Sequence, residues 1–309
     1  MLSVIFVRAE EAVTEKIKVT TLLLDPVDSQ RSRTVPLKIY HTASETSKPV
    51  ILFSHGLGGS REANPYLGNH WAKNGYVVVF VQHAGSDSEV WKSAPAAERM
   101  SALKKAAGPR AAIDRMLDIP FVIDQLEKWN VDESHPLHSR LDLERIGMSG
   151  HSFGAVTTVA VAGKKFRGGP SQPEPRLDAF LPMSPQPGKG LPASESFGHL
   201  KKPFLCMTGT EDGSPIDTSL KPETRRKVYE ALLSGDKYQL VLKDAHHFAF
   251  GEGGKKRTRN PDHHPTILEI STRFWDAYLK SDISAKAWLQ SEAPKSITSM
   301  APEDVWEWK

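Results

Sequence analysis

The sequence predicts an α/β fold in which a mostly parallel, doubly wound sheet follows an antiparallel N-terminal lead-in. Uninterrupted apolar runs at 50–53 and 76–81 are typical of strands covered on both faces, as in a parallel sheet. Between these runs, residues 62–74 are spaced as a helix that ends at Gly75. Because strand and helix then alternate over most of the chain, we expect one doubly wound sheet.

The lead-in consists of two β-rich stretches at 16–24 and 35–41. Each contains Thr, Val, Ile or Leu, and each is closed by turn residues, Asp25 and Pro26 in the first case. We expect both stretches to be strands that precede the parallel part of the sheet.

The later elements follow the same reasoning. A long helical region is expected over 95–129, where apolar residues recur at helical spacing and Pro120 predicts a kink or a restart. The loop-rich segments are insertions, so we expect one domain over 1–309. The remaining elements, in chain order, are a strand at 145–148, a helix at 156–162, strands at 177–183 and 203–208, a helix at 222–233, the last strand at 238–242 and a closing helix at 266–279.

The composition narrows the class of partner. Forty basic and 37 acidic residues leave a net charge of +3, too small a field to favour nucleic acid. No apolar run approaches the roughly 18 residues that a membrane span needs, so we expect a soluble chain without stable membrane insertion. The single cysteine, Cys206, lies in an apolar run and is expected to be a buried structural thiol.

The N-terminus leaves the localisation open. Residues 1–15 are either a frayed N-terminus or the remnant of an export signal, because Val7, Arg8 and Ala9 have the small-residue look of a cleavage site. We therefore expect a cytoplasmic or an exported protein, and the oligomeric state is not predicted.

A glycine-rich turn carries the first chemical signal. Gly150, His151, Ser152, Phe153 and Gly154 join an apolar strand to a small-residue apolar helix. Glycines allow close approach of the neighbouring elements in such a turn, which lifts the serine Oγ out at the C-terminal edge of the sheet. The helix N-terminus also favours developing negative charge. Ser152 is therefore the expected nucleophile.

A serine nucleophile needs a base and an acid that orients the base. Asp212 follows the strand at 203–208 and His247 follows the last strand, so Ser152, Asp212 and His247 come in the order of a triad on this kind of sheet. Glu211, Asp217 and Asp244 are possible acids, but the turn places Asp212 best. His246 and His247 are adjacent and point different ways, so we expect only one to reach Ser152.

Acyl transfer also needs donors for a tetrahedral oxyanion. The segment Ser54-His55-Gly56-Leu57-Gly58-Gly59 follows the first central strand, where the second donor of such a site resides. We expect the backbone N–H groups of Leu57 and Phe153 to form the oxyanion hole. The His55 side chain is expected to brace this loop rather than to act as the base.

These segments resemble α/β hydrolases of the platelet-activating-factor acetylhydrolase and predicted dienelactone hydrolase groups. The resemblance rests on three segments and runs from about residue 16 to residue 289, with bacterial polyester-degrading cutinases as more distant relatives. It implies the α/β-hydrolase fold. The segments are Phe-Ser-His-Gly-Leu-Gly-Gly-Ser-Arg at 53–61, Gly-Tyr-Val-Val with Gln-His-Ala-Gly-Ser-Asp between 75 and 87, and Gly-His-Ser-Phe-Gly at 150–154.

The resemblance also implies site residues. The base of that family is a His with a Phe three positions later, which His247 and Phe250 match, whereas Ala249 stands three positions after His246. It likewise supports Asp212 within Gly-Thr-x-Asp. Dienelactone hydrolases proper use a cysteine nucleophile, so the serine at position 152 means that a lactone substrate is not implied.

The expected function is a carboxylesterase-like serine hydrolase that forms an acyl-enzyme on short-acyl or small soluble esters. No cofactor, metal or nucleic acid is expected, and the partner is a small-molecule ester. Alternatives are an acyltransferase or peptidase on the same triad, separable with amides and alcohol acceptors. A non-catalytic binding protein of this fold, which would not react with a fluorophosphonate, is the other alternative.

Some further residues have weaker signals. Trp91, His151 and His246 are possible pocket-lining residues. The spacing of Asp262, His263 and His264 matches no zinc pattern. The basic run at 255–259 is expected to be a solvated face, and Trp288, Trp306 and Trp308 are expected to pack the C-terminal tail.

Overall fold

The computed structural model describes residues 17–169, 171–251, 260–297 and 299–309. The remnant suggested by Val7, Arg8 and Ala9 and the basic run at 255–259 lie outside these residues. The strands of the described part are β1 (Val19–Leu24), β2 (Val27–Asp28), β3 (Arg33–Thr34), β4 (Leu37–Thr42), β5 (Lys48–Ser54), β6 (Val77–Val81), β7 (Leu141–His151), β8 (Leu177–Met183), β9 (Phe204–Glu211), β10 (Lys237–His246) and β11 (Val305–Trp308).

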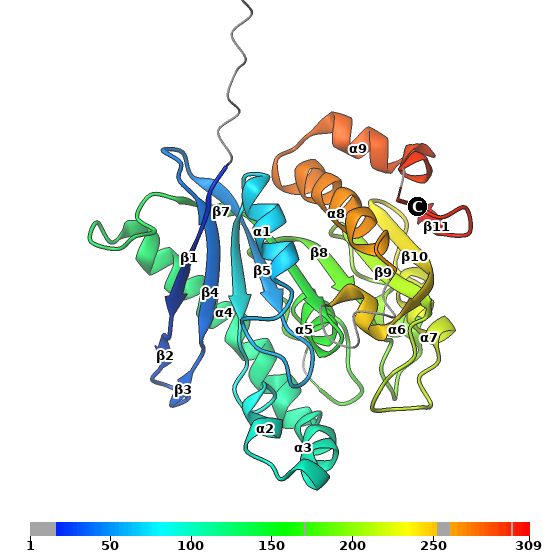
Figure 1. Ribbon diagram of the computed structural model, residues 1–309, viewed down its shortest axis with the longest axis horizontal. Coiled ribbons are helices and arrows are strands. Elements are labelled where there is room, and N and C mark those ends of the chain that lie inside the picture. The colour runs from blue at the N-terminus through cyan, green and yellow to red at the C-terminus, as the bar shows by residue number, and fades with distance from the viewer. Residues whose placement is uncertain (1–16, 170, 252–259, 298) are drawn as a thin grey trace, which may run out of the picture.

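One mixed sheet contains nine of these strands, in the order β1-β4-β6-β5-β7-β8-β9-β10-β11 (Figure 1). The six strands from β6 to β10 in that order are parallel, whereas β1, β4 and β11 pair antiparallel to their neighbours. The predicted parallel sheet with an antiparallel lead-in is therefore confirmed. A separate hairpin of β2 and β3 stands at the β1 edge.

Helices cover both faces of the sheet. One face packs against α1, α8 and α9, and the other packs against α4, α5, α6 and α7. The helical segments are α1 (Pro65–Lys73), α2 (Glu89–Lys92), η1 (Ala96–Glu98), α3 (Arg99–Ala106), α4 (Pro109–Val131), α5 (Phe153–Val161), α6 (Ala193–Phe197), α7 (Pro222–Ala231), η2 (His247–Phe250), α8 (His263–Leu279), α9 (Ile283–Leu289) and η4 (Ala293–Ser296).

The long helical region expected over 95–129 is divided differently from the prediction. The break falls at Gly108 and Pro109, the N-cap and first residue of α4, and α4 then continues through Pro120. Proline is well tolerated in the first turn, where its missing N–H has no helical acceptor. The break separates α3 from α4, and α2 and α3 lie together below the sheet (Figure 1).

A last strand was also missing from the prediction, which ended the sheet at 238–242. Residues of β11 pair antiparallel with β10 from Tyr238 to Val241. Trp306 is buried and its ring stacks on Tyr238 at 5.7 Å between centroids. Packing of the tail by Trp306 is therefore seen, but within a strand.

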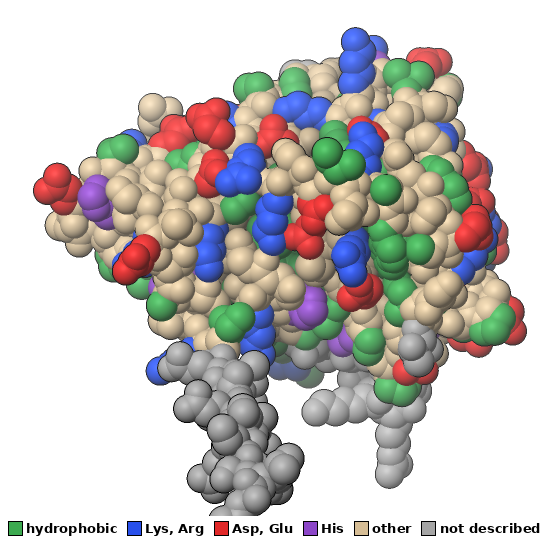
Figure 2. Space-filling model, turned by 90° about the horizontal axis from the view of Figure 1, so that it is seen from above, with side chains coloured by type: hydrophobic (Ala, Val, Ile, Leu, Met, Phe, Trp, Pro, Cys, Tyr) green, Lys and Arg blue, Asp and Glu red, His purple; other side chains and the backbone are tan. Residues whose placement is uncertain are grey.

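Charged side chains are mixed over the surface. Lys and Arg lie interspersed with Asp and Glu on the face seen from above (Figure 2), in keeping with the small net charge of +3. No helix in the described ranges is long and apolar enough to cross a membrane.

The topology brings polar residues together at one edge of the sheet. Parallel strands end on the same side of a sheet, and the ends of β5, β7, β9 and β10 carry Ser54, His151, Glu211 and His246. In such sheets the ligand site lies outside the carboxyl ends of the strands.

The approach of α8 to the sheet depends on Gly147 in β7. A Cβ at this position would lie 2.6 Å from Cζ3 of the buried Trp275 and 3.0 Å from Cδ1 of Leu279. We expect Gly147→Ala to lower the free energy of unfolding by about 1–3 kcal/mol through overpacking. Urea unfolding followed by tryptophan fluorescence measures the change.

Gly169→Ala is the matched control, since its added Cβ would meet Phe166 at an ordinary 3.4 Å. Equal effects of the two substitutions would contradict the close packing inferred at Gly147.

Candidate active site

Ser152 stands between β7 and α5 in a strained backbone conformation, with φ of 58° and ψ of −113°. Such conformations cost about 1–3 kcal/mol and are found at functional sites. The turn is possible because Gly154 passes against the end of β5, where a Cβ would lie 1.8 Å from the carbonyl oxygen of Ser54. The Ser152 N–H donates to the Met183 carbonyl over 3.0 Å, which ties the turn to β8.

A continuous hydrogen-bond chain joins Ser152, His247 and Asp212. His247 Nε2 lies 2.8 Å from Ser152 Oγ, and His247 Nδ1 lies 2.8 Å from Asp212 Oδ1. Because an ionised carboxylate only accepts, Nδ1 carries the proton and Nε2 is free to accept the serine hydroxyl. Asp212 is fully buried, and its Oδ2 accepts a 2.9 Å bond from Thr208 Oγ1.

The other candidates for acid and base lie elsewhere. Asp217 and Asp244 bind Lys189 and Lys243 in ion pairs, and Glu211 is exposed. His246 caps η2, where its Nδ1 accepts from the Phe248 N–H over 3.2 Å. The structure thus brings Asp212 and His247, rather than their neighbours in sequence, to Ser152.

A buried arginine lies behind the acid. Arg225 Nε donates to the Asp212 carbonyl over 2.5 Å and forms an ion pair with Asp212 Oδ1 at 3.0 Å. Its Nη1 donates to the Ser184 carbonyl over 2.7 Å. Arg225 therefore connects the segments after β8 and β9 and fixes the carboxylate that faces His247.

The loop after β5 passes close to Ser152 at Gly56. Gly56 lies against the serine, since an added Cβ would be 3.4 Å from Ser152 Cβ. The Gly56 carbonyl accepts from the Gly59 N–H at 3.0 Å and from His55 Nδ1 at 2.6 Å. In a trans peptide the N–H points opposite to the carbonyl, so the Leu57 N–H points away from these two donors.

The Leu57 and Phe153 N–H groups are the two that the sequence assigns to the oxyanion hole. Phe153 is the first residue of α5, where an N–H has no partner within the helix. Neither N–H has a hydrogen-bond partner among the described residues. Both remain available to an incoming oxygen.

His55 braces this loop as a neutral imidazole. Its Nδ1–H donates to the Gly56 carbonyl, so Nε2 accepts the 3.0 Å bond from the His83 N–H. Burial, reinforced by the charge of Arg115, lowers the pKa of His55 well below its usual value. These contacts match the bracing role expected for His55.

A second serine, histidine and aspartate chain lies inside the protein. Ser54 Oγ is 2.8 Å from His83 Nε2, and His83 Nδ1 is 2.9 Å from Asp118 Oδ2. All three residues are fully buried, so no substrate can reach this serine. Burial lowers the pKa of His83 to about 4, and the His83 N–H supports the loop after β5 by donating to His55 Nε2 at 3.0 Å.

Arg115 completes this buried network. It is fully buried and has no carboxylate ion-pair partner in the part of the chain that is described. Its Nε donates to Ser86 Oγ at 2.8 Å, and its Nη1 donates to the His55 carbonyl at 2.7 Å. Burial lowers the pKa of Arg115 to about 9, although the nearby carboxylates of Asp118 and Asp87 oppose this shift.

Sequence reasoning missed Arg115 and Asp118 because charged residues on a helix are usually solvated. A signal was nevertheless present. Both residues stand on the face of α4 that also carries buried Ile119, Val122 and Leu126, at spacings of three and four residues. A charged pair within an apolar helical stripe indicates buried ion-pair or hydrogen-bonding partners. Arg225 likewise shares the buried face of α7 with Val228 and Tyr229.

The possible pocket-lining residues have defined contacts. Trp91 in α2 donates from Nε1 to the Gly58 carbonyl over 2.8 Å and so packs on the loop after β5. His151 is buried, and its Nε2 donates to the His247 carbonyl over 2.9 Å. His246 is half-buried beside Phe248, which is 42% exposed.

Other candidate chemistry is not assembled near Ser152. Among the described residues, no group of three or more His, Cys, Asp and Glu side chains could hold a metal ion. His263 and His264 bind the Lys243 and Ala249 carbonyls. Burial raises the pKa of the Cys206 thiol to about 12, so this residue is not a nucleophile.

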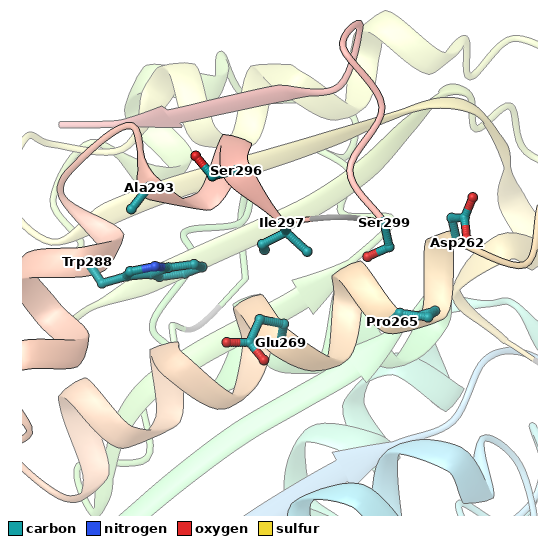
Figure 3. Close-up of a pocket in the computed structure, with 8 residues that line it drawn as sticks. All are labelled: Asp262, Pro265, Glu269, Trp288, Ala293, Ser296, Ile297 and Ser299. Carbon is teal, nitrogen blue, oxygen red and sulfur yellow. The ribbon is translucent and has the colours of Figure 1, made fainter.

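A cavity of about 630 Å³ lies between α8, α9 and the C-terminal segment (Figure 3). Glu269 and Pro265 on α8 face Trp288 and Ile297 across it. Its lining includes none of the residues of the Ser152 site.

Comparisons with known proteins agree with the fold. Residues 12–104 match the family model described as platelet-activating factor acetylhydrolase, isoform II. A solved structure of a ferulic acid esterase from Streptomyces cinnamoneus superposes with a TM-score of 0.65 at 18% identity, covering 96% of this chain and 98% of that one. The chain has the α/β-hydrolase fold. The resemblance noted in the sequence is thus confirmed by the family-model match over residues 12–104 and by the shared fold.

Curated relatives of low sequence identity include a cutinase and an acetylhydrolase. Cutinase est1 of Thermobifida alba is 24% identical over 213 residues, which cover 68% of this chain and 57% of the cutinase. The platelet-activating factor acetylhydrolase of Cavia porcellus is 28% identical over 134 residues, which cover 36% of this chain and 31% of that protein. The aligned part of this chain therefore spans less than two thirds of either relative.

The stability of the buried network should depend on Asp118, which accepts from His83 and from Arg31 and Arg33. We expect Asp118→Asn to lower the free energy of unfolding by about 3–5 kcal/mol, because it removes a fully buried carboxylate and leaves the partly buried Arg33 guanidinium without its ion-pair partner. Urea unfolding at pH 7 measures this loss. Asp124→Asn is the control, since its carboxylate pairs with Arg176 at the surface and should contribute at most about 1 kcal/mol.

The stability lost in Asp118→Asn should depend on pH. Burial alone would raise the pKa of Asp118, but hydrogen bonds from His83 and Arg33 outweigh burial and hold the pKa well below its usual value. A carboxylate with a depressed pKa stabilises the folded state fully above about pH 4 and loses this effect as the pH falls. The stability difference between the native protein and Asp118→Asn should therefore shrink below pH 4. A difference that grows on acidification would contradict it.

Proposed function

We propose that this α/β hydrolase is a serine carboxylic-ester hydrolase that works through an acyl-enzyme on short-acyl or small soluble esters. The hydrogen-bond chain from Asp212 through His247 to Ser152, with two links of 2.8 Å, is the observation that carries the proposal. The esterase activities named for its relatives support the substrate class.

In the acylation step, His247 Nε2 takes the hydroxyl proton as Ser152 Oγ attacks the ester carbonyl carbon. The carbonyl oxygen becomes an oxyanion that accepts from the Leu57 and Phe153 N–H groups. The tetrahedral intermediate collapses, the alkoxide leaves with the proton from His247, and the acyl group stays on Ser152. Asp212 holds the imidazole and stabilises its charged form.

In the deacylation step, water takes the place of the alcohol. His247 removes a proton from water as its oxygen attacks the acyl carbon, and the same two N–H groups bind the second oxyanion. Collapse releases the carboxylic acid and returns the proton to Ser152 Oγ. The two steps sum to ester plus water giving acid plus alcohol, without a cofactor.

The nucleophile can be tested directly. We expect the protein to hydrolyse p-nitrophenyl butyrate and to be labelled by a fluorophosphonate at Ser152, because only this serine of the two Ser-His-Asp chains is accessible. Ser152→Ala should lose activity by at least about 10³-fold. Peptide mapping after labelling locates the modified residue. Full activity in Ser152→Ala, or labelling of Ser54, would overturn the assignment.

The choice of base can be tested with the adjacent histidines as a matched pair. We expect His247→Ala to lower kcat by about 10³–10⁴-fold, since the hydroxyl then lacks a proton acceptor. His246→Ala should stay within a few-fold of the native rate, because His246 caps η2 and does not contact Ser152. Steady-state kinetics on p-nitrophenyl butyrate distinguishes them, and the reverse ranking would make His246 the base.

A further inference from the structure

Arg115 contacts both halves of the proposed oxyanion hole. Its guanidinium carbon lies 4.3 Å from the ring centre of Phe153, whose N–H is one donor. Its Nη1 donates at 2.7 Å to the His55 carbonyl, one residue before the Gly56–Leu57 peptide that supplies the other donor. Arg115 also holds the far end of this loop through Ser86.

Ser86 links the guanidinium to the loop in two ways. Its hydroxyl accepts from Arg115 Nε at 2.8 Å, and its carbonyl accepts from the Gly58 N–H at 2.9 Å. The carbonyls of His55 and Ser86 therefore fix the segment on either side of Leu57. The planar fork of an arginine can make such contacts at several angles, whereas the ammonium of a lysine cannot.

The burial of this group needs an explanation beyond folding. A buried charge without a carboxylate partner is costly, and an apolar residue of similar volume is often at least as stabilising. The guanidinium here is fully buried and donates only to carbonyl and hydroxyl oxygens in the described structure, with its Nη2 3.3 Å from His55 Nδ1. The burial of this guanidinium is explained if the group holds the two oxyanion donors in their relative positions.

We infer that Arg115 is a positioning residue for the oxyanion hole. Its buried guanidinium fixes the loop that contains Leu57 relative to Phe153, so that the two N–H groups keep their relative positions. The inference rests on the proposed ester hydrolysis. Its positive charge also lies behind the two donors, where it favours an oxyanion over a neutral carbonyl. The effect therefore appears in the transition state rather than in substrate binding.

The test compares Arg115→Met, which removes fork and charge, with Arg115→Lys, which keeps the charge. We expect kcat on p-nitrophenyl butyrate to fall about 100-fold in Arg115→Met with KM within about threefold, as for loss of an oxyanion donor. Affinity for n-butylboronic acid, which binds serine as a tetrahedral anion, should fall by a similar factor. Arg115→Lys should recover only part of either loss.

Arg176→Met is the control for losing an arginine network, because Arg176 binds Glu174, Asp124 and Glu127 away from Ser152. It should lower stability without changing kcat. An active, folded Arg115→Met with native kcat and native boronate affinity would overturn the inference, as would a loss shared equally between kcat and KM.

Amide hydrogen exchange separates this inference from the proposed function. We expect peptides covering 54–60 to exchange faster in Arg115→Met, with the β8 peptide 177–183 unchanged. A native protein that neither turns over esters nor labels at Ser152 would refute the proposed function, whatever the exchange result. Unchanged exchange over 54–60 would refute the positioning role even in an active enzyme.

Discussion

The close passage of Gly154 against the end of β5 is the constraint on which the rest of the site depends. A Cβ there would overlap the Ser54 carbonyl at 1.8 Å, so α5 can begin beside the loop after β5 only with glycine. This contact places Ser152 and the Phe153 N–H next to the peptide of Gly56 and Leu57. The strained φ of 58° at Ser152 follows from the same crowding.

Buried charge surrounds this arrangement on both sides. Arg225 lies behind Asp212 in a direct ion pair, whereas Arg115 lies behind the oxyanion loop without one in the described structure. The Asp212 carboxylate, which binds His247, is thereby fixed by a neighbour of opposite charge, and the Phe153 ring, whose N–H is one of the proposed oxyanion donors, lies against the Arg115 guanidinium. Each arginine also donates to backbone carbonyls. Arg225 binds those of Asp212 and Ser184, and Arg115 binds those of His55 and Ser86.

The sequence allowed prediction of the features that depend on local pattern. The apolar run of β6 is recognisable because every residue of this strand is buried. The turn at Ser152 is recognisable because glycines flank the serine between an apolar strand and an apolar helix. Asp212 and His247 could be placed because each follows a strand. Strand β11 escaped prediction because it is short, half-exposed and recognisable only by its pairing with β10. Arg115 escaped because its hydrogen-bond partners are 29 to 61 residues away in sequence.

The lone thiol of Cys206 gives the protein an internal reporter of its own unfolding. The residue is buried within β9. Its high pKa disfavours the thiolate, which is the form that reacts with thiol reagents. A reagent such as a dithiobis-nitrobenzoate can therefore modify the chain only when β9 opens. Since the chain contains one cysteine in all, the rate of modification counts openings of the strand that ends beside Asp212, independently of any turnover at Ser152.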